Sequence, residues 1–309
     1  MKITDQEIKL VVEIVRNAIR ITEWFKKKGF QSYIKQDHSP VTLADFASQI
    51  YIISKLKEIF PEDSIIAEEN FSTEVNLASK KLIYSCYNEL DLDIKYHFKD
   101  ILNYRGKLSE TRWSIDPIDG TKGYQEGLSY AIGIGLIDNL KMVFSVIGVP
   151  NYSNNQIAIF YANKSRGANA SYGDRGFKPI SVNDKKNVKD YLLCYSLHYD
   201  EPWVMKLAKI IGINKYIQID SMAKFCMIAD GSADLYLKPM NKDRSFIWDF
   251  LPGHLLVTEA GGIVTDLMGQ VPQYIDDKCI ISGPGLVVSN GKSHEEIIET
   301  IRNNPTLFN

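Results

Sequence analysis

The chain has 309 residues, a length that suits one large fold or two subdomains sharing a core. With 45% hydrophobic and 24% charged residues, its composition is that of a globular protein and excludes extensive disorder. A net charge of −2, from 36 basic and 38 acidic residues, argues against nucleic-acid or membrane binding through a diffuse positive field. We therefore expect no nucleic-acid or membrane partner, and any anionic ligand must be held locally.

The N-terminal part predicts two helices. Thr4 and Glu7 form a capping-box pair, and apolar residues recur with a helical period up to Gly29. The charges that interrupt this apolar pattern are typical of an amphipathic helix and not of a signal peptide. After a polar turn, residues 45–60 predict a second helix, which Pro61 stops.

The middle of the chain predicts several strands around a surface excursion. Residues 64–67 predict a strand that ends at two glutamates. Residues 70–112 are polar and weakly periodic, which predicts an excursion over the surface before the chain returns to the core. Further strands are predicted over residues 113–115, 130–137, 142–149 and 155–161, with a hairpin turn at 138–141.

Strands and helices alternate in the second half, which argues for layered α/β packing. No repeat, low-complexity tract, linker or apolar run of transmembrane length interrupts the chain. We predict an N-terminal subdomain over residues 1–160 and a C-terminal subdomain over residues 161–309. The predicted strands here cover 191–197, 216–219, 233–237, 263–265, 279–281 and 286–289, and the helices cover 202–211, 221–229, 248–260 and the segment from Ser293.

The four cysteines are widely scattered and include no CxxC pair. This pattern favours reduced structural thiols over disulfides or metal ligands, and reduced thiols are typical of the cytoplasm. We therefore expect a cytoplasmic protein, and we expect it to be a monomer.

The stretch 112-RWSIDPIDGTKGY-124 joins a predicted strand to a turn rich in small and acidic residues. The proline between Asp116 and Asp119 disfavours a helix there, so both carboxylates are presented at a strand end. Gly120 permits an unusual backbone angle, and Thr121 suits the start of a helix whose N–H groups would bind an anion. Two carboxylates beside an anion site fit bound cations and a phosphate, as in metal-assisted phosphoryl transfer.

More acidic residues interrupt or follow apolar segments, where a solvated charge is not expected. All-oxygen ligation favours Mg²⁺ or Mn²⁺, and the five histidines lack the spacing of a zinc site. Taken singly, each acidic motif also fits a structural role as a helix cap, a first-turn acid or a solvated strand end. These acids are Asp45 in 39-SPVTLADFASQ-49, Glu68 and Glu69 in 65-IIAEEN-70, and Asp249 in 248-WDFLPG-253.

In combination, the motifs SPVTLAD, AEE, WSIDPIDGTKGY and WDFLPGHLLVTEAGGIVTD resemble the inositol monophosphatase superfamily of lithium-sensitive, magnesium-dependent phosphatases. They occur in this order from residue 39 to residue 266 and so span most of the chain. Within the superfamily, SPVTLADFASQ, DPIDGTKGY and 220-DSMAKFCMIADGSADLYLKP-239 are most similar to the 3′(2′),5′-bisphosphate nucleotidases. The resemblance implies a layered α/β/α/β/α sandwich of the inositol monophosphatase and fructose-1,6-bisphosphatase type.

The resemblance also implies the metal ligands. Glu68, Asp116 and the carbonyl of Ile118 would bind a first ion. Asp116, Asp119 and Asp249 would bind a second, and Glu68 would help to hold a weaker third. One departure is Ala67, because the family usually has glycine before its two glutamates.

The remaining site residues carried over by the resemblance concern the water and the substrate. Asp45 and Thr121 would orient and deprotonate the attacking water, while the Gly120 and Thr121 amides hold the phosphate. Lys238 stands where an arginine is common, so it keeps the charge without the bidentate fork. The residues that fall where the nucleotidases contact the nucleotide are His198, Ser221, Lys224 and Lys238.

We predict a phosphomonoesterase that uses two or three Mg²⁺ ions, is inhibited by Li⁺, and removes the 3′-phosphate of adenosine 3′,5′-bisphosphate to give AMP and phosphate. Inositol polyphosphate 1-phosphatase or inositol monophosphatase activity on inositol phosphates is the open alternative. The aspartyl-phosphate phosphatases are disfavoured, because their DxDGT motif spaces its acids i, i+2 and not i, i+3. A regulatory protein that only binds metal would not require both Asp45 and Thr121.

Overall fold

The computed structural model describes residues 3–29, 32–35, 39–70, 77–153, 155–240 and 245–308. A seven-stranded sheet with the order β3-β4-β5-β6-β7-β8-β9 occupies its first part. β3 and β4 are parallel, and the other neighbours are antiparallel. The strands are β3 (Ser64–Ala67), β4 (Thr111–Asp119), β5 (Ala131–Asp138), β6 (Lys141–Val149), β7 (Ala158–Asn163), β8 (Gly167–Tyr172) and β9 (Lys178–Ile180).

A second, five-stranded sheet has the order β11-β10-β12-β16-β13. Its first three strands are parallel to one another, and β16 runs antiparallel to both of its neighbours. Two short hairpins, β1 with β2 and β14 with β15, lie outside the two large sheets. The strands are β1 (Ser32–Ile34), β2 (Pro40–Thr42), β10 (Leu192–Tyr195), β11 (Lys215–Gln218), β12 (Leu235–Pro239), β13 (Ile263–Asp266), β14 (Gln273–Ile275), β15 (Lys278–Ile280) and β16 (Gly285–Ser289).

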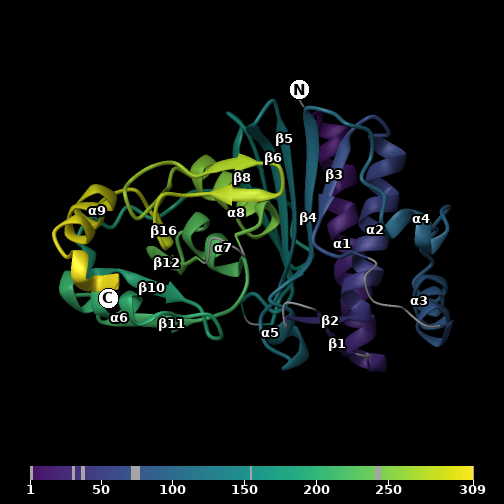
Figure 1. The fold of residues 1–309 in the computed structure, drawn as a ribbon, viewed down its shortest axis with the longest axis horizontal. Coiled ribbons are helices and arrows are strands. Elements are labelled where there is room, and N and C mark those ends of the chain that lie inside the picture. The colour runs from purple at the N-terminus through teal and green to yellow at the C-terminus, as the bar shows by residue number, and fades with distance from the viewer. Residues whose placement is uncertain are drawn as a thin grey trace.

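Helices and sheets alternate in layers (Figure 1). α1 (Asp5–Lys28) and α2 (Leu43–Ile59) pack on one face of the seven-stranded sheet, and α8 (Ile247–Glu259) packs on its other face. α7 (Ala223–Ala229) lies with α8 between the two sheets, and α6 (Pro202–Ile211) and α9 (His294–Arg302) lie on the outer side of the second. The predicted α/β/α/β/α order is confirmed. In the part of the chain that the structure describes, no helix is both long and apolar enough to cross a membrane.

Both N-terminal helices begin with a capping box. The Thr4 side chain accepts a hydrogen bond from the Glu7 amide and the Glu7 side chain caps the Thr4 amide, as the sequence predicts. In α2 the same roles fall to Thr42 and Asp45. The second helix therefore begins at Leu43, two residues before its predicted start, and Asp45 lies inside its first turn. This matters for the site, because Asp45 is held by the backbone from which the helix starts.

The predicted surface excursion over residues 70–112 is wrong for much of its length. α3 (Leu77–Glu89) and α4 (Phe98–Leu102) lie there, and Ile83, Cys86 and Ile101 are fully buried against the N-terminal helices. Each helix is short and contributes only a few apolar residues, so the sequence period is weak. Residues 71–76 lie outside the described part of the chain.

Other elements agree with the sequence to within a few residues. The turn at 138–141 is confirmed, because Asn139 and Leu140 both have positive φ and join β5 to β6. The strand predicted over 155–161 is β7. β8 and β9 were not predicted, since β8 is rich in glycine, alanine and serine, and β9 is only three residues long with a central proline. The division at residue 160 stays a prediction. The chain passes from the seven-stranded sheet to the five-stranded sheet between Ile180 and Leu192.

Glycine in β5 allows α8 to approach the first sheet closely. A Cβ added at Gly135 would lie 2.0 Å from the Leu251 side chain, and one at Gly133 would lie 2.3 Å from Met222. A side chain at either position would have to displace the side chain of Leu251 or Met222, which packs there against the sheet. Since Asp249 is in the first turn of α8, this contact also sets how close Asp249 comes to β4.

Candidate active site

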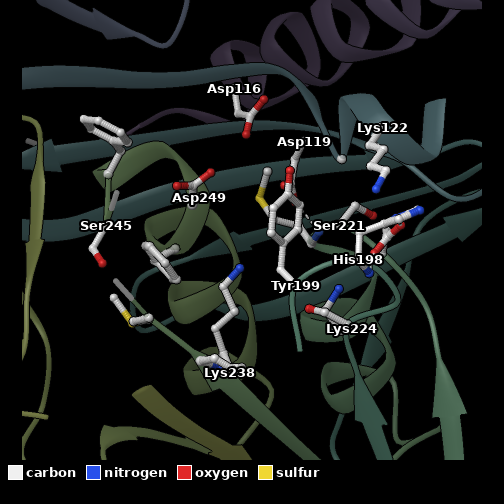
Figure 2. Close-up of a pocket in the computed structure, with 18 of the residues that line it drawn as sticks. Asp116, Asp119, Lys122, His198, Tyr199, Ser221, Lys224, Lys238, Ser245 and Asp249 are labelled. Atoms are coloured by element: carbon white, nitrogen blue, oxygen red, sulfur yellow. Dashed lines mark hydrogen bonds and ion pairs between the residues drawn. The ribbon is translucent and has the colours of Figure 1, made fainter. Parts of the chain in front are cut away.

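A cleft of about 840 Å³ lies where β4, α5 (Thr121–Gln125) and the starts of α7 and α8 meet (Figure 2). Both halves of the chain contribute to its lining. Of the predicted site residues, only Asp45 is absent from the wall, because it is fully buried behind Thr121. The predicted residues that line the cleft are Glu68, Asp116, Ile118, Asp119, Gly120, Thr121, His198, Ser221, Lys224, Lys238 and Asp249.

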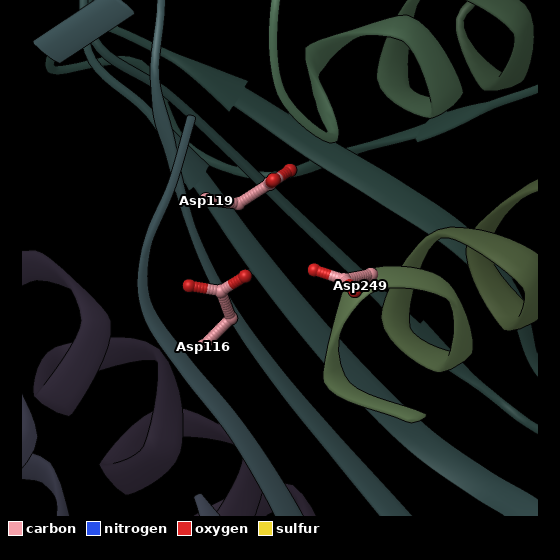
Figure 3. A group of neighbouring side chains, drawn as sticks. All are labelled: Asp116, Asp119 and Asp249. Carbon is pink, nitrogen blue, oxygen red and sulfur yellow. The ribbon is translucent and has the colours of Figure 1, made fainter. Parts of the chain in front are cut away.

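Three carboxylates converge in this cleft (Figure 3). Asp116 and Asp119 come from β4, which bulges between them, and Asp249 comes from α8. One oxygen of each lies within 4.8 Å of the others, the only such group of potential metal ligands found among the described residues. The strand predicted to stop before the motif continues through Asp119, and the bulge turns both side chains toward α8.

Electrostatics in this cluster favour a bound cation. Burial raises the pKa of Asp116 well above its usual range, and the charges of Glu68, Asp119 and Asp249 add to the shift. Burial and the charge of Asp119 likewise raise the pKa of Asp249. Several buried carboxylates with this spacing repel one another when ionised. Their oxygen atoms suit a hard divalent ion such as Mg²⁺, which would relieve the repulsion.

Glu68 and Glu69 follow β3 at the edge of the cluster. The Lys35 ammonium lies 2.8 Å from Oε1 of Glu68 and 2.5 Å from Oε1 of Glu69. The side-chain amide of Gln49 donates to the Glu69 carbonyl at 2.7 Å and accepts from the Glu69 amide at 2.9 Å. The alanine that precedes the pair is not among the residues with positive φ, so Ala67 fits the strand without strain.

Asp45 and Thr121 are in contact, as their predicted pairing requires. Oδ2 of Asp45 accepts from the Thr42 amide at 2.8 Å and from its hydroxyl at 2.6 Å. Oδ1 lies 3.2 Å from the Thr121 hydroxyl, which is also 3.1 Å from the Ile118 carbonyl oxygen. Because the hydroxyl has a single proton, it donates to one of these oxygens at a time. Burial, opposed by the Thr42 hydrogen bonds and aided by Glu68, raises the pKa of Asp45 to about 6.

The turn before α5 requires glycine for two reasons. Gly120 has φ +85°, a left-handed conformation, and a Cβ there would lie 3.3 Å from the Cβ of Ser221. Ser221 itself has φ 68°, which is uncommon for serine. Two segments far apart in the sequence therefore meet with unusual backbone angles beside the carboxylates, as is common at functional sites.

Two lysines form the opposite wall of the cleft. Lys224 is 2% exposed and its Nζ donates to the Ile219 carbonyl at 2.8 Å. Burial, with the nearby charge of Lys238, lowers the pKa of Lys224 to about 8. Lys238 extends from β12 toward the aspartates, with Nζ 5.5 Å from the centre of the Phe250 ring (Figure 2). The cleft thus places cationic groups opposite its acidic cluster.

His198 is held between two carboxylates. Its Nδ1 is hydrogen-bonded to Asp220, and its Nε2 lies 3.1 Å from Oε2 of Glu126. Asp220 also accepts from the backbone amides of Leu197 and His198. A hydrogen bond from Nε2 to a ligand would therefore compete with Glu126, and the predicted nucleotide contact of His198 stays a prediction.

Several site residues were missed by the sequence analysis. Lys35 belongs to a segment that the sequence predicts only as a polar turn, and Glu126 follows the DPIDGTKGY motif. Gln49 and Asp220 lie within quoted motifs, so their position was a usable signal. Their contact partners could not be predicted, because a local sequence pattern contains no information about contacts between distant parts of the fold.

Residues 3–306 match the model of the inositol monophosphatase family, and the chain belongs to that family. A 3′(2′),5′-bisphosphate nucleotidase of Schizosaccharomyces pombe is 32% identical over 333 aligned positions, which cover 96% of this chain and 94% of the relative. A 3′,5′-bisphosphate nucleotidase 2 of Arabidopsis thaliana is 28% identical, with 96% of each chain covered.

Solved structures support the fold. The IMPase of Thermotoga maritima superposes with a TM-score of 0.72 at 18% identity, covering 98% of this chain and all of the other. A 2′AMP-bound SaIMPase-II superposes with a TM-score of 0.65, also at 18% identity, with 99% and 97% of the chains covered. These likenesses concern the fold, which is that of the inositol monophosphatases.

Proposed function

We propose that this protein is a magnesium-dependent 3′(2′),5′-bisphosphate nucleotidase that hydrolyses adenosine 3′,5′-bisphosphate to AMP and phosphate. The observation that carries the phosphatase chemistry is the contact between Thr121 and buried Asp45, beside the carboxylates of Asp116, Asp119 and Asp249. Metal binding alone does not require a hydroxyl–carboxylate pair at this position. Such a pair is suited to orienting and deprotonating water.

The carboxylates fit the expected ions by ligand type and charge. Glu68, Asp116 and the Ile118 carbonyl would hold one ion, and Asp116, Asp119 and Asp249 a second, with Glu68 contributing to a third. Bound Mg²⁺ would lower the pKa of the attacking water and neutralise charge on the leaving oxygen. Lithium inhibition by replacement of one ion is part of the same proposal.

This chain's own residues would then act as follows. The Thr121 hydroxyl passes its own proton to Asp45 as it takes one from water, and both donors of Thr42 hold Asp45 in place for this transfer. The amides of Gly120 and Thr121 hold the phosphate at the start of α5. Attack is direct, so no phosphoenzyme forms.

The choice of a nucleotide rests on the relatives and on the cationic wall. Proteins named as bisphosphate nucleotidases match this chain over nearly their full length. Lys224 and Lys238 would bind the second phosphate, which a simple inositol monophosphate lacks, and Ser221 and His198 would contact the rest of the nucleotide. The four cysteines are buried and unpaired, in keeping with the proposed cytoplasmic location, and the expected monomer stays a prediction.

Inositol polyphosphate 1-phosphatase or inositol monophosphatase activity is the second candidate. It is favoured by one specific finding, since SaIMPase-II structures exist both with inositol monophosphate and with 2′AMP bound. The two ligand classes are therefore compatible with one fold.

A phosphate-release assay with a substrate panel tests the proposal. Adenosine 3′,5′-bisphosphate, inositol 1-phosphate and inositol 1,4-bisphosphate are compared at equal Mg²⁺. We expect kcat/KM to be much the highest for the nucleotide, and AMP to be the product. An equal or higher kcat/KM for either inositol phosphate would reject the nucleotidase assignment and leave the metal-dependent phosphatase in place.

A further inference from the structure

Lys35 places a positive charge directly on Glu68, the carboxylate expected to bind the first ion and to help hold the weaker third. It follows β1, and its backbone amide donates to the Ser39 carbonyl across the β1–β2 hairpin. Its Nζ contacts Glu68 at 2.8 Å and Glu69 at 2.5 Å, with all three side chains largely buried. Lys35 also lines the active-site cleft.

Glu69 anchors this pair of contacts. The side-chain amide of Gln49 hydrogen-bonds to both the backbone N–H and the backbone carbonyl of Glu69. The Glu69 side chain is only 3% exposed. Glu68 is more open, with 22% of its side chain exposed, and it faces the cleft. The Lys35 ammonium therefore binds the fixed carboxylate of Glu69. It also binds the carboxylate of Glu68, which a ligand in the cleft could reach.

We propose that Lys35 is a tethered cation that competes with a divalent ion for Glu68 and so sets the affinity of the weakest metal position. The inference rests on the proposed metal dependence. Mg²⁺ would lie about 2.0–2.1 Å from a ligand oxygen. An ammonium hydrogen-bonded to that carboxylate both occupies a lone pair and repels the ion.

The charges around Glu68 also support a role for Lys35 in weakening metal binding. The Lys35 ammonium offsets negative charge on the carboxylates of Glu68 and Glu69, which it contacts at 2.8 and 2.5 Å. Removing the lysine charge would leave Glu68, which lines the cleft, beside the buried carboxylate of Glu69 with no ammonium between them, and this is a stronger site for a divalent cation. The opposite role, in which Lys35 only holds Glu68 in place for the metal, makes the opposite prediction for metal affinity.

The test measures Mn²⁺ binding to the purified protein without substrate, by calorimetry and by the electron paramagnetic resonance of free Mn²⁺. Lys35→Met removes the charge but keeps most of the length of the side chain, and Lys35→Arg keeps the charge. We expect Lys35→Met to bind Mn²⁺ about tenfold more tightly at its weakest step. Lys35→Arg should bind Mn²⁺ like the unmodified protein.

Two further variants locate the effect. Lys35→Met combined with Glu68→Gln should bind Mn²⁺ no more tightly than Glu68→Gln alone, because the carboxylate for which lysine and ion compete is gone. Lys107→Met removes another lysine that pairs with a glutamate, Glu62, but on the exposed surface, and should change nothing. If Lys35→Met folds poorly, Lys35→Gln is measured through the thermal shift that Mn²⁺ produces.

Unchanged or weaker Mn²⁺ binding in Lys35→Met would overturn the proposal, and weaker binding there would assign Lys35 the holding role. Because no substrate is present, the result is independent of whether the enzyme prefers nucleotides. Failure of the nucleotidase assignment would appear in the substrate panel alone. Absence of Mn²⁺ binding in the unmodified protein would instead reject the metal dependence itself.

Discussion

The two walls of the cleft are built on opposite principles. The acidic wall gathers Asp116, Asp119 and Asp249 so closely that their mutual repulsion and burial raise the pKa values of Asp116 and Asp249. The cationic wall is internally satisfied, since Lys224 donates to a carbonyl and His198 is held by carboxylates. The first wall would be stabilised further by a ligand that supplies positive charge, whereas the second is already stabilised by contacts within the protein. Changes in the acidic wall should therefore affect chemistry, and changes in the cationic wall should affect substrate choice.

Asp116→Asn should give the largest effect. It tests most directly whether the acidic wall is required for the chemical step. It removes the charge shared by both expected metal positions and keeps the size of the side chain. Since a buried, repelled carboxylate becomes a neutral amide, the fold should be retained. We expect activity to fall by more than the about 10²- to 10⁴-fold typical of losing a positioned base. Circular dichroism checks the fold, and calorimetric Mg²⁺ titration should show weakened binding. Near-normal rates at modest Mg²⁺ would exclude a bridging role.

Thr121→Ala should come next, with a loss of about 10²- to 10⁴-fold in kcat and little change in KM. Without the hydroxyl, Asp45 loses its contact with the expected water position. Thr121→Ser is the matched control, because it keeps the hydroxyl and should keep most of the rate. Steady-state kinetics decide the matter. A raised KM with unchanged kcat would show that Thr121 contributes to substrate binding and not to the chemical step.

The same contrast explains which features of the fold and the site could be predicted from the sequence. The acidic residues lie in long motifs, so their approach to one cleft could be anticipated, as could the layered fold from the alternation of strands and helices. The partners of Lys35 and His198 could not, because Glu69, Asp220 and Glu126 reach them only through the fold. The β4 bulge and the early start of α2 were also missed. Both depend on pairing and capping geometry that local propensity does not encode.

Lys224→Met sharpens the contrast on the cationic wall. Loss of a charged hydrogen bond of about 1.5–3 kcal/mol corresponds to a rise of about 10- to 100-fold in KM for adenosine 3′,5′-bisphosphate. Inositol 1-phosphate, which has no second phosphate, should be turned over as before. A parallel loss for both substrates would show that Lys224 acts on the shared chemistry and not on substrate choice.

The pH dependence of KM gives a second readout for the same residue. Because the pKa of Lys224 is lowered to about 8, its charge is present below that pH and is lost as the pH rises through it. The KM for the nucleotide should therefore rise above about pH 8 in the unmodified protein. The inflection should be absent in Lys224→Met, and its persistence there would assign it to another group.

Gly120→Ala should give the smallest effect on rate and tests the point where the two walls touch. A left-handed conformation costs an L-residue about 1–2 kcal/mol, and the new methyl group would also press on Ser221. Gly127→Ala is the matched control, since Gly127 also has positive φ, at +75°, but has nothing within 4 Å of its added Cβ. Both variants should lose stability in urea denaturation, and Gly120→Ala should lose more because of its contact with Ser221.

Only Gly120→Ala should also lower kcat/KM, by about tenfold, because it displaces the phosphate-binding turn against Ser221. The kinetic loss should exceed any fraction of unfolded protein, which the urea titration measures independently. Equal kinetic losses in the two variants would mean that backbone strain alone is responsible. The meeting of Gly120 with Ser221 would then have no special part in joining the metal cluster to the substrate-binding wall.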